Sequence, residues 1–182
     1  MIIANNIQKS FGPQSLFEGV SFLINEGERV GLVGKNGTGK STLFKMVLGQ
    51  ESLDSGYLTT PKGYRIGALE QIISFTQPTV LKECVQVLST EKQWEHYKAE
   101  IILSGLGFSE QDFHKDPATF SGGYQVRINL CKALLANPNM LLLDEPTNYL
   151  DILSLRWLKE YLNKWPGEMI LITHDRDFMD KV

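Results

Sequence analysis

Cysteines are scarce in this sequence, and their scarcity limits the chemistry open to the chain. Only Cys84 and Cys131 occur among 182 residues, far apart and without the spacing typical of zinc ligands. This excludes a disulfide-stapled framework and a cysteine-based zinc site. Two buried thiols in a reducing cytosol fit the sequence best, so we predict a cytoplasmic protein.

Long apolar runs and blocks of charge of one sign are also missing. No apolar stretch approaches the ~18 residues of a membrane-spanning helix, and no basic-then-apolar leader opens the chain. We therefore expect no direct membrane insertion, so that a membrane role would need a partner. The 18 basic and 21 acidic residues give a net charge of -3 without a long Lys/Arg run, which excludes an obvious nucleic-acid-binding surface.

The sequence does contain an alternation of short apolar runs with helical patterns, which predicts an α/β fold with a mostly parallel sheet. Residues 79–115 carry only helical patterns and predict a helical lobe. We expect one domain over residues 1–182, with its core in 1–70 and 138–182 and the lobe in about 72–137. Strands are predicted at residues 1–3, 21–24, 29–33, 64–69, 140–143 and 169–173, and helices at 41–48, 121–136 and from 151 onward.

A glycine-rich segment between a predicted strand and a predicted helix carries the strongest chemical signal. Residues 34–42 fit the phosphate-loop pattern G-x-x-x-x-G-K-[ST]. Its glycines allow a tight turn whose N–H groups point at phosphate oxygens, and the following helix adds the positive end of its dipole. Lys40 is expected to reach the β and γ phosphates, and the Ser41 hydroxyl to bind Mg²⁺. We assign nucleotide binding to Gly34, Asn36, Gly37, Gly39, Lys40, Ser41 and Thr42.

Two acids follow a fully apolar run at residues 141–143, at the strand end where ligands gather in open α/β sheets. Asp144 is expected to hold Mg²⁺, and Glu145 to act as the general base on an attacking water. Taken alone, such a pair also fits a charged turn after a strand. The phosphate loop favours the catalytic interpretation, and together the two motifs predict a Mg-dependent nucleotide hydrolase.

A third motif, Phe120-Ser121-Gly122-Gly123-Tyr124, narrows the choice among phosphate-loop proteins. It resembles the L-S-G-G-Q signature of ATP-binding-cassette (ABC) ATPases, with phenylalanine in place of leucine and tyrosine in place of glutamine. The resemblance covers nearly the whole chain and implies a P-loop NTPase fold of ABC type, with an antiparallel N-terminal β part. It also implies that ATP is the substrate, and that Ser121, Gly122 and Gly123 form a second anion-binding helix start.

Single positions elsewhere match the same family. The resemblance implies that Gln71 senses Mg²⁺ and the attacking water, that His174 contacts the γ-phosphate as a catalytic residue, and that Phe11 stacks on adenine. Leu150-Asp151 matches the loop that crosses between paired domains. By themselves, a histidine after a strand and an aromatic residue at a strand end also fit purely structural roles.

The segment around the acid pair points to one branch of the family. Residues 144–151 read D-E-P-T-N-Y-L-D and resemble the D-E-P-T-N-H-L-D of ABC-F proteins, whereas transporter subunits more often read D-E-P-x-S-A-L-D. ABC-F proteins are soluble, usually carry two cassettes in one chain, and many act on the ribosome. The resemblance implies a first cassette that binds ATP and Mg²⁺ and pairs head to tail with a second cassette, with the ribosome as a further partner.

Two departures from the ABC-F pattern concern length. Gln71 and Ser121 are 50 positions apart, which leaves room for the ordinary helical lobe but not for the long arm that ABC-F proteins usually insert there. The chain ends at Val182, before the family's usual final strands.

Two other functions stay open, the ATPase subunit of a membrane transporter and a nucleotide-gated binding module that does not hydrolyse ATP. The intact Lys40, Asp144, Glu145 and His174 argue against the second.

Overall fold

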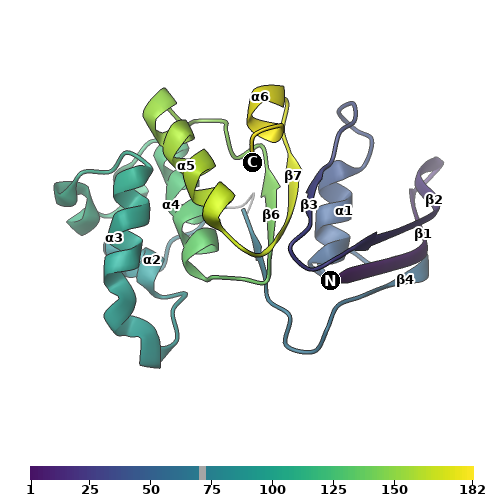
Figure 1. Ribbon diagram of the computed structural model, residues 1–182, viewed down its shortest axis with the longest axis horizontal. Coiled ribbons are helices and arrows are strands. Elements are labelled where there is room, and N and C mark those ends of the chain that lie inside the picture. The colour runs from purple at the N-terminus through teal and green to yellow at the C-terminus, as the bar shows by residue number, and fades with distance from the viewer. Residues whose placement is uncertain (70–72) are drawn as a thin grey trace.

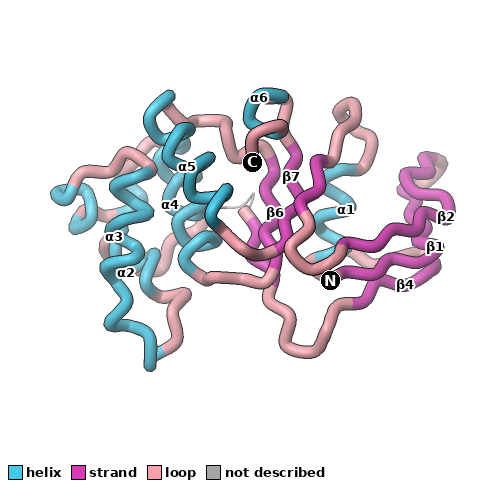
Figure 2. The backbone as a smooth tube through the Cα atoms, viewed as in Figure 1, coloured by secondary structure: helices cyan, strands magenta, loops and turns pink. Residues whose placement is uncertain are grey.

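The computed structural model describes residues 1–69 and 73–182, and within them the chain forms two sheets, a helix between the sheets, and a helical lobe. Figure 1 shows the small antiparallel sheet at one end of the molecule and the lobe at the other. The same division is visible in Figure 2, where most of the helices gather on one side. The predicted class, a mostly parallel α/β sheet with an antiparallel N-terminal part and a helical lobe, is confirmed.

The antiparallel sheet has the strand order β2-β1-β4 and consists of β1 (Ile2–Phe11), β2 (Gln14–Ile24) and β4 (Ser55–Thr59). A tight turn at Gly12, whose φ of 57° favours glycine, joins β1 to β2 and places Phe11 opposite Gln14. The hairpin is much longer than the strands predicted at residues 1–3 and 21–24. Its outer half is largely exposed and mixes polar with apolar residues, so it lacks the apolar runs by which a strand is recognised.

The parallel sheet has the order β3-β7-β6-β5 and consists of β3 (Arg29–Gly31), β7 (Glu168–Ile172), β6 (Met140–Asp144) and β5 (Ile66–Ala68). Strand β7 is buried along its whole length, and β6 is buried up to its last residue, as expected for strands covered on both faces. The carboxyl ends of β3, β6 and β7 therefore meet at one edge, which is the ligand-binding edge of open α/β sheets.

Helix α1 (Lys40–Val47) lies between the two sheets. Phe44 and Val47 pack in the apolar cluster that includes β6 and β7, whereas Leu43 and Met46 pack against β1. Because both sheets hold the helix, its first turn is fixed at the edge where the parallel strands end.

The lobe shares its core with the parallel sheet, because one apolar cluster runs from α2, α3 and α4 to the side chains of β6 and β7. Two of the helices begin at side-chain caps: Thr79 accepts from the N–H of Lys82, and Asp151 accepts from the N–H of Ser154. The lobe consists of α2 (Val80–Val85), a 3-10 turn at Thr90–Glu95, α3 (His96–Gly105), 3-10 turns at Glu110–His114 and Pro117–Thr119, and α4 (Gly122–Leu135), while α5 (Ile152–Lys164) and α6 (Arg176–Met179) follow β6 and β7.

Hydrogen bonds of buried polar groups hold the segments of the lobe together. The Glu83 carboxylate accepts from Lys132 Nζ at 2.7 Å and from the N–H groups of Thr76 and Gln77 at 3.0 Å each. Burial favours the neutral acid, but these hydrogen bonds outweigh it and hold the pKa of Glu83 below its usual value. Cys84 and Cys131 are buried free thiols, as predicted, and burial raises the pKa of Cys131.

Candidate active site

The phosphate loop leads from β3 into the first turn of α1. Gly37 and Gly39 have φ values of 81° and 96°, which side chains rarely allow, and the loop therefore depends on glycine at both positions. Gly39 is the N-cap of α1, and neither a side-chain cap nor an acidic residue occupies the first turn. The free N–H groups and the positive end of the helix dipole are therefore available to an anion.

Lys40 supplies the positive charge of the loop. Its Nζ donates to the carbonyl oxygens of Gly34 at 2.8 Å and Lys35 at 3.0 Å. In the described part of the chain no carboxylate forms an ion pair with Lys40. The ammonium is held over the loop by backbone dipoles alone, so its charge is available to a phosphate.

Two oxygen ligands converge beside the loop. Ser41 Oγ donates to Asp144 Oδ2 at 2.8 Å, joining the start of α1 to the end of β6. Hydroxyl and carboxylate oxygens suit Mg²⁺, which proteins usually hold through one or two carboxylates together with substrate phosphates. No cluster of three or more His, Cys, Asp and Glu side chains suited to a metal exists among residues 1–69 and 73–182. The residues present therefore fit a Mg²⁺ ion that arrives with its nucleotide.

Glu145 has an unusual backbone and an incompletely satisfied carboxylate. Its φ is 50°, and its N–H donates to the carbonyl of Ile172 at 2.8 Å, which fixes the turn after β6. One carboxylate oxygen, Oε1, is buried without a hydrogen bond in the described structure, and His174 Nε2 lies 3.5 Å from it. A buried acceptor without a partner at the mouth of a site is suited to a water or ligand proton.

A hollow of about 650 Å³ brings most of the predicted residues together, within the size range of small-ligand sites. Four of its lining residues were not predicted as site residues: Gln14, Leu16, Asn148 and Ile172. Gln14 and Leu16 reach the hollow because β2 pairs with β1 in a hairpin. The glycine at position 12 is the sequence signal that could have indicated this hairpin. The predicted residues that line the hollow are Phe11, Asn36, Gly37, Gly39, Lys40, Ser41, Thr42, Asp144, Glu145 and His174.

Four predicted residues do not line the hollow, and a fifth is not among the described residues. Ser121, Gly122 and Gly123 stand at the start of α4 and do not line this hollow. The Ser121 side chain makes no capping bond, so its hydroxyl is not used within the helix. Gly34 contributes its carbonyl to Lys40 rather than a surface to the hollow. Gln71 lies outside the described residues.

An aromatic cluster explains both departures from the signature sequence. Phe120 and Tyr124, which replace leucine and glutamine, lie 5.8 Å apart between ring centroids, and Phe108 lies 5.5 and 5.1 Å from them, edge-on to Tyr124. The guanidinium of Arg127 lies 4.6 Å from the centroid of the Tyr124 ring. Such contacts stabilise the first turn of α4 by packing rather than by a side-chain cap.

The fold and the site define a phosphate-loop nucleotide-binding protein of the kind that hydrolyses a terminal phosphate. A sequence profile of the family described as "ABC transporter" matches residues 17–148. The chain belongs to the ATP-binding cassette family. Its ABC-F resemblance is confirmed by the curated relatives that match it.

Two of these relatives come from Escherichia coli (strain K12). "Probable ATP-binding protein YheS" is 34% identical over 212 residues and matches 100% of this chain and 33% of its own length. "Energy-dependent translational throttle protein EttA" is 38% identical over 186 residues and matches 98% of this chain and 33% of its own length. The chain thus spans about a third of the length of the curated relatives that it matches.

Solved structures agree on the fold. The dimeric "post-hydrolysis state of the ATP-binding cassette MJ0796 bound to ADP and Pi" superimposes with a TM-score of 0.80 at 23% identity, covering 98% of this chain and 90% of that one. No helix in the described ranges of this chain is long and apolar enough to cross a membrane.

Proposed function

We propose that this chain is the first cassette of a cytoplasmic ABC-F protein and that it hydrolyses Mg-ATP when it is paired head to tail with a second cassette. The observation that carries the proposal is the convergence of a free helix start, Lys40, the Ser41–Asp144 oxygen pair and Glu145 on one hollow. These are the groups that phosphoryl transfer requires: an anion cradle, a Mg²⁺ site and a group that takes a proton from water.

The contacts and the family resemblance together support the following residue roles. The phosphate loop and Lys40 hold the β and γ phosphates, Phe11 meets adenine, and Gln71 is proposed to assist at the Mg²⁺ and the attacking water. Ser41 and Asp144 would hold Mg²⁺, which would neutralise charge on the phosphate oxygens. Water attacks the γ-phosphorus while Glu145 takes its proton, and the bond to the β–γ bridging oxygen breaks to leave ADP and phosphate. His174, 3.5 Å from Glu145, is proposed to contact the γ-phosphate.

Pairing is proposed because the signature residues do not line the hollow of their own chain. Ser121, Gly122 and Gly123 start a helix outside their own hollow, so that they are available to the ATP of a second cassette. YheS and EttA are about three times as long as the part that matches this chain, which leaves room for a second cassette in proteins of that length. The MJ0796 cassette, which shares the fold, is described as a dimer.

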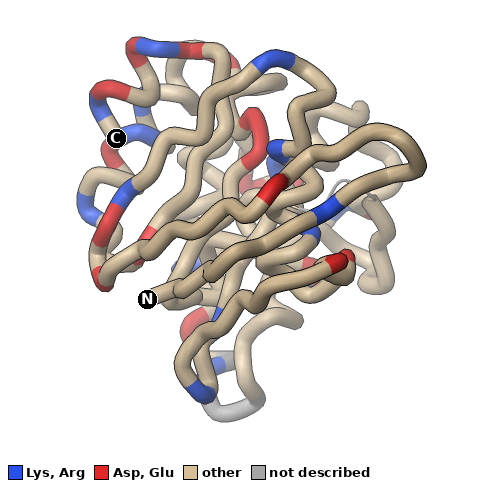
Figure 3. Tube along the Cα trace, turned by 90° about the vertical axis from the view of Figure 1, so that its right-hand side faces the viewer, with Lys and Arg blue, Asp and Glu red and all other residues tan. Residues whose placement is uncertain are grey.

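A role in translation rests on the name of one relative, the translational throttle protein EttA, and we propose the ribosome as a partner on that basis. On the side that carries the antiparallel sheet, basic and acidic residues are interspersed rather than gathered into a basic face (Figure 3). Ribosome binding at this side would therefore depend on shape and on ATP-driven closure more than on bulk charge.

The hydrolytic proposal is tested by phosphate release from the full-length protein, with Lys40→Ala as the matched control. We expect saturable, Mg-dependent release that falls by about tenfold or more in Lys40→Ala, since a charge-assisted bond to phosphate is worth ~1.5–3 kcal/mol. Folded wild-type protein that binds ATP without releasing phosphate would instead be a nucleotide-gated binding module.

The ribosome proposal needs a separate experiment. The Glu145→Gln variant, incubated with ATP, is expected to sediment with ribosomes through a sucrose cushion, and to stay in the supernatant with ADP. Equal sedimentation with both nucleotides, or none with either, contradicts a nucleotide-dependent ribosome role. Recovery with an integral-membrane protein instead would favour the transporter subunit.

A further inference from the structure

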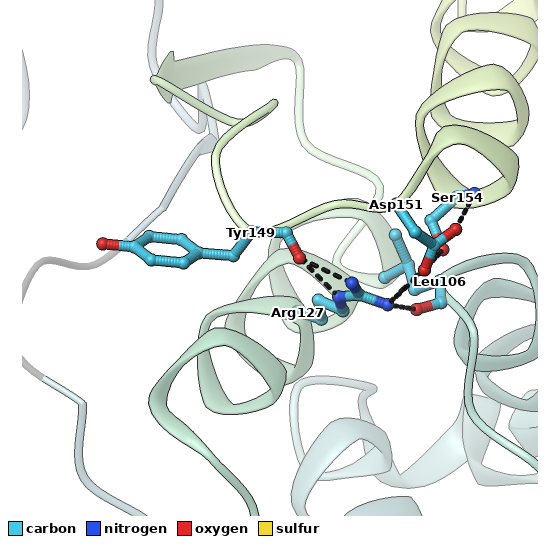
Figure 4. A network of polar contacts seen from close by, with 5 residues as sticks. All are labelled: Leu106, Arg127, Tyr149, Asp151 and Ser154. Atoms are coloured by element: carbon cyan, nitrogen blue, oxygen red, sulfur yellow. Dashed lines mark hydrogen bonds and ion pairs between the residues drawn. The ribbon is translucent and has the colours of Figure 1, made fainter.

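Arg127 lies in α4, outside the hollow, and has no part in the hydrolysis described above. It is buried, with 7% of its surface exposed. Its Nε and Nη2 both donate to the carbonyl oxygen of Tyr149, at 2.9 and 2.6 Å, and its Nη1 donates to the Leu106 carbonyl at 2.9 Å and to Asp151 Oδ2 at 3.0 Å. Figure 4 shows the guanidinium between these groups, with the Tyr149 ring turned away from it.

The network joins three segments that are distant in sequence: the signature helix, the end of α3, and the loop from Glu145 to Asp151. Within the described residues Asp151 is the one carboxylate paired with Arg127, and its side chain is 53% exposed. Its other hydrogen bonds go to the carbonyls of Tyr149 and Leu106, apart from a 3.5 Å contact between Nη1 and Ser154 Oγ. A movement of the loop that removed the Tyr149 carbonyl would leave two N–H groups of a buried guanidinium without partners, which is costly.

The loop that Arg127 holds begins with the proposed general base and is strained at two positions. Glu145 and Tyr149 have φ values of 50° and 70°, in the left-handed region that non-glycine residues seldom adopt. The Tyr149 side chain is 65% exposed, so side-chain burial does little to keep it there. The bidentate bond from Arg127 holds its carbonyl instead.

One signature glycine, Gly123, lies close to the same residue. A Cβ added to Gly123 would lie 3.2 Å from the Cβ of Tyr149, so the start of α4 and the loop are already in close contact. Arg127 and Gly123 therefore approach Tyr149 from the same helix, one through its backbone carbonyl and the other through its side chain.

We infer that Arg127 is a positioning residue that couples the signature start of α4 to the loop carrying Glu145. The inference rests on the proposed function, in which the signature residues and Glu145 face two different ATP molecules. Ser121 to Gly123 would meet the nucleotide of the second cassette, whereas Glu145 acts on the nucleotide of this chain. The planar guanidinium of Arg127 is rigid and is bonded to the loop that carries Glu145. A shift of α4 when ATP binds at one site would therefore move Glu145, the proposed general base of the other site.

The first test needs no pairing. Arg127→Lys keeps the charge and loses the fork, and Arg156→Lys, an exposed arginine of α5 with no ion pair in the described structure, is the matched control. Hydrogen exchange of the amides at 147–151 should become about tenfold faster in Arg127→Lys and stay unchanged in the control, while Mg-ATP affinity stays within about twofold of wild type. Exchange unchanged in a folded Arg127→Lys variant would overturn the inference.

The second test uses the full-length protein with both cassettes. Arg127→Lys should lower kcat about tenfold or more with KM within about twofold, and should reduce the Hill coefficient for ATP toward one. An unchanged kcat and Hill coefficient beside active wild type would contradict the coupling, whereas inactive wild type would contradict the proposed function instead. If Arg127→Lys does not fold, the Asp151→Asn variant tests the inference. Its amide oxygen can still cap α5, while its NH₂ group replaces the carboxylate oxygen that accepts from Arg127 Nη1. It should show the same losses, and wild-type behaviour would reject the inference.

Discussion

The two surfaces proposed to meet ATP are constructed in opposite ways. On the phosphate-loop side, the hydrogen bonds of Lys40 to the described residues go to carbonyls, one buried oxygen of Glu145 has no hydrogen bond from those residues, and the His174 side chain is 71% exposed. On the signature side, Phe108, Phe120 and Tyr124 pack ring against ring, and each guanidinium nitrogen of Arg127 donates a hydrogen bond. The side proposed to perform the chemistry has polar groups available to a substrate, whereas the other side uses its side chains to fix a helix start.

This contrast predicts a separation of effects. Substitutions on the phosphate-loop side should change ATP binding or turnover with little change in folding, because the substituted groups have few partners in the protein. Substitutions of the buried lobe side chains other than Arg127 should do the reverse, because these side chains are buried and bonded within the lobe.

The largest effect is expected from Glu145→Gln. The amide keeps the shape and loses the base, so turnover in the paired protein should fall by about 10²–10⁴, which is roughly 3–5 kcal/mol. Mg-ATP affinity and the thermal midpoint should stay close to wild type. Phosphate release within tenfold of wild type would remove Glu145 from the role of base, and a large loss of stability would break the contrast.

Glu83→Gln should have the next largest effect, on the free energy of unfolding. It removes the charge that pairs with Lys132 inside the lobe, and we expect a loss of about 2–3 kcal/mol at neutral pH in urea unfolding. Because the folded-state pKa of Glu83 is lowered, its contribution is complete above the unfolded pKa of about 4.5 and is lost as the pH falls through the folded value. The gap between wild type and variant should therefore narrow in acid. A constant gap from pH 7 to pH 3 would show that the charge does not matter.

Phe11→Ala tests the phosphate-loop side at its adenine end. The ring is 49% exposed and lines the hollow, with Lys9 Nζ 5.0 Å from its centroid. Loss of stacking should weaken ATP binding by about 1 kcal/mol, measured by titration calorimetry, with an unchanged unfolding midpoint. Wild-type affinity in the folded variant would place adenine elsewhere.

Tyr124→Leu is the counterpart on the signature side and should give the smallest effect. It removes an edge-to-face aromatic contact and the stacked guanidinium, each worth about 0.5–1 kcal/mol, so stability should fall by roughly 1 kcal/mol. The affinity of the chain for Mg-ATP should not change. A variant that bound ATP as weakly as Phe11→Ala does would show that the two sides are not separate.

The same two sides differ in how far the sequence predicts them. The phosphate loop and the acid pair are continuous segments whose residue types are set by local backbone geometry, so they could be read directly and the structure brings them together. Gln14 and Leu16 reach the hollow only because the hairpin pairs Phe11 with Gln14, and the outer half of that hairpin has no apolar pattern.

The signature side depends on contacts between distant segments. Phe108 meets Tyr124, and Arg127 meets Tyr149, across loops whose course the sequence does not specify. From the sequence, Tyr124 could therefore be recognised only as a departure from the family signature. The structure explains this departure by the packing of Tyr124 against Phe108 and Arg127. Helix existence and the caps at Thr79 and Asp151 were predictable because they are local.

The central claim is that this chain supplies one side of a two-sided ATP site, and ATPase activity measured against protein concentration tests it most directly. Without a second signature helix, charge on the transferring phosphoryl group meets water, so the monomer should bind Mg-ATP and hydrolyse it slowly. Specific activity should rise with concentration if the chain pairs with itself, or on addition of the second cassette if it does not, after a circular-dichroism check of folding. Rapid turnover that is independent of concentration, in a protein confirmed as a monomer by light scattering, would contradict the two-sided site.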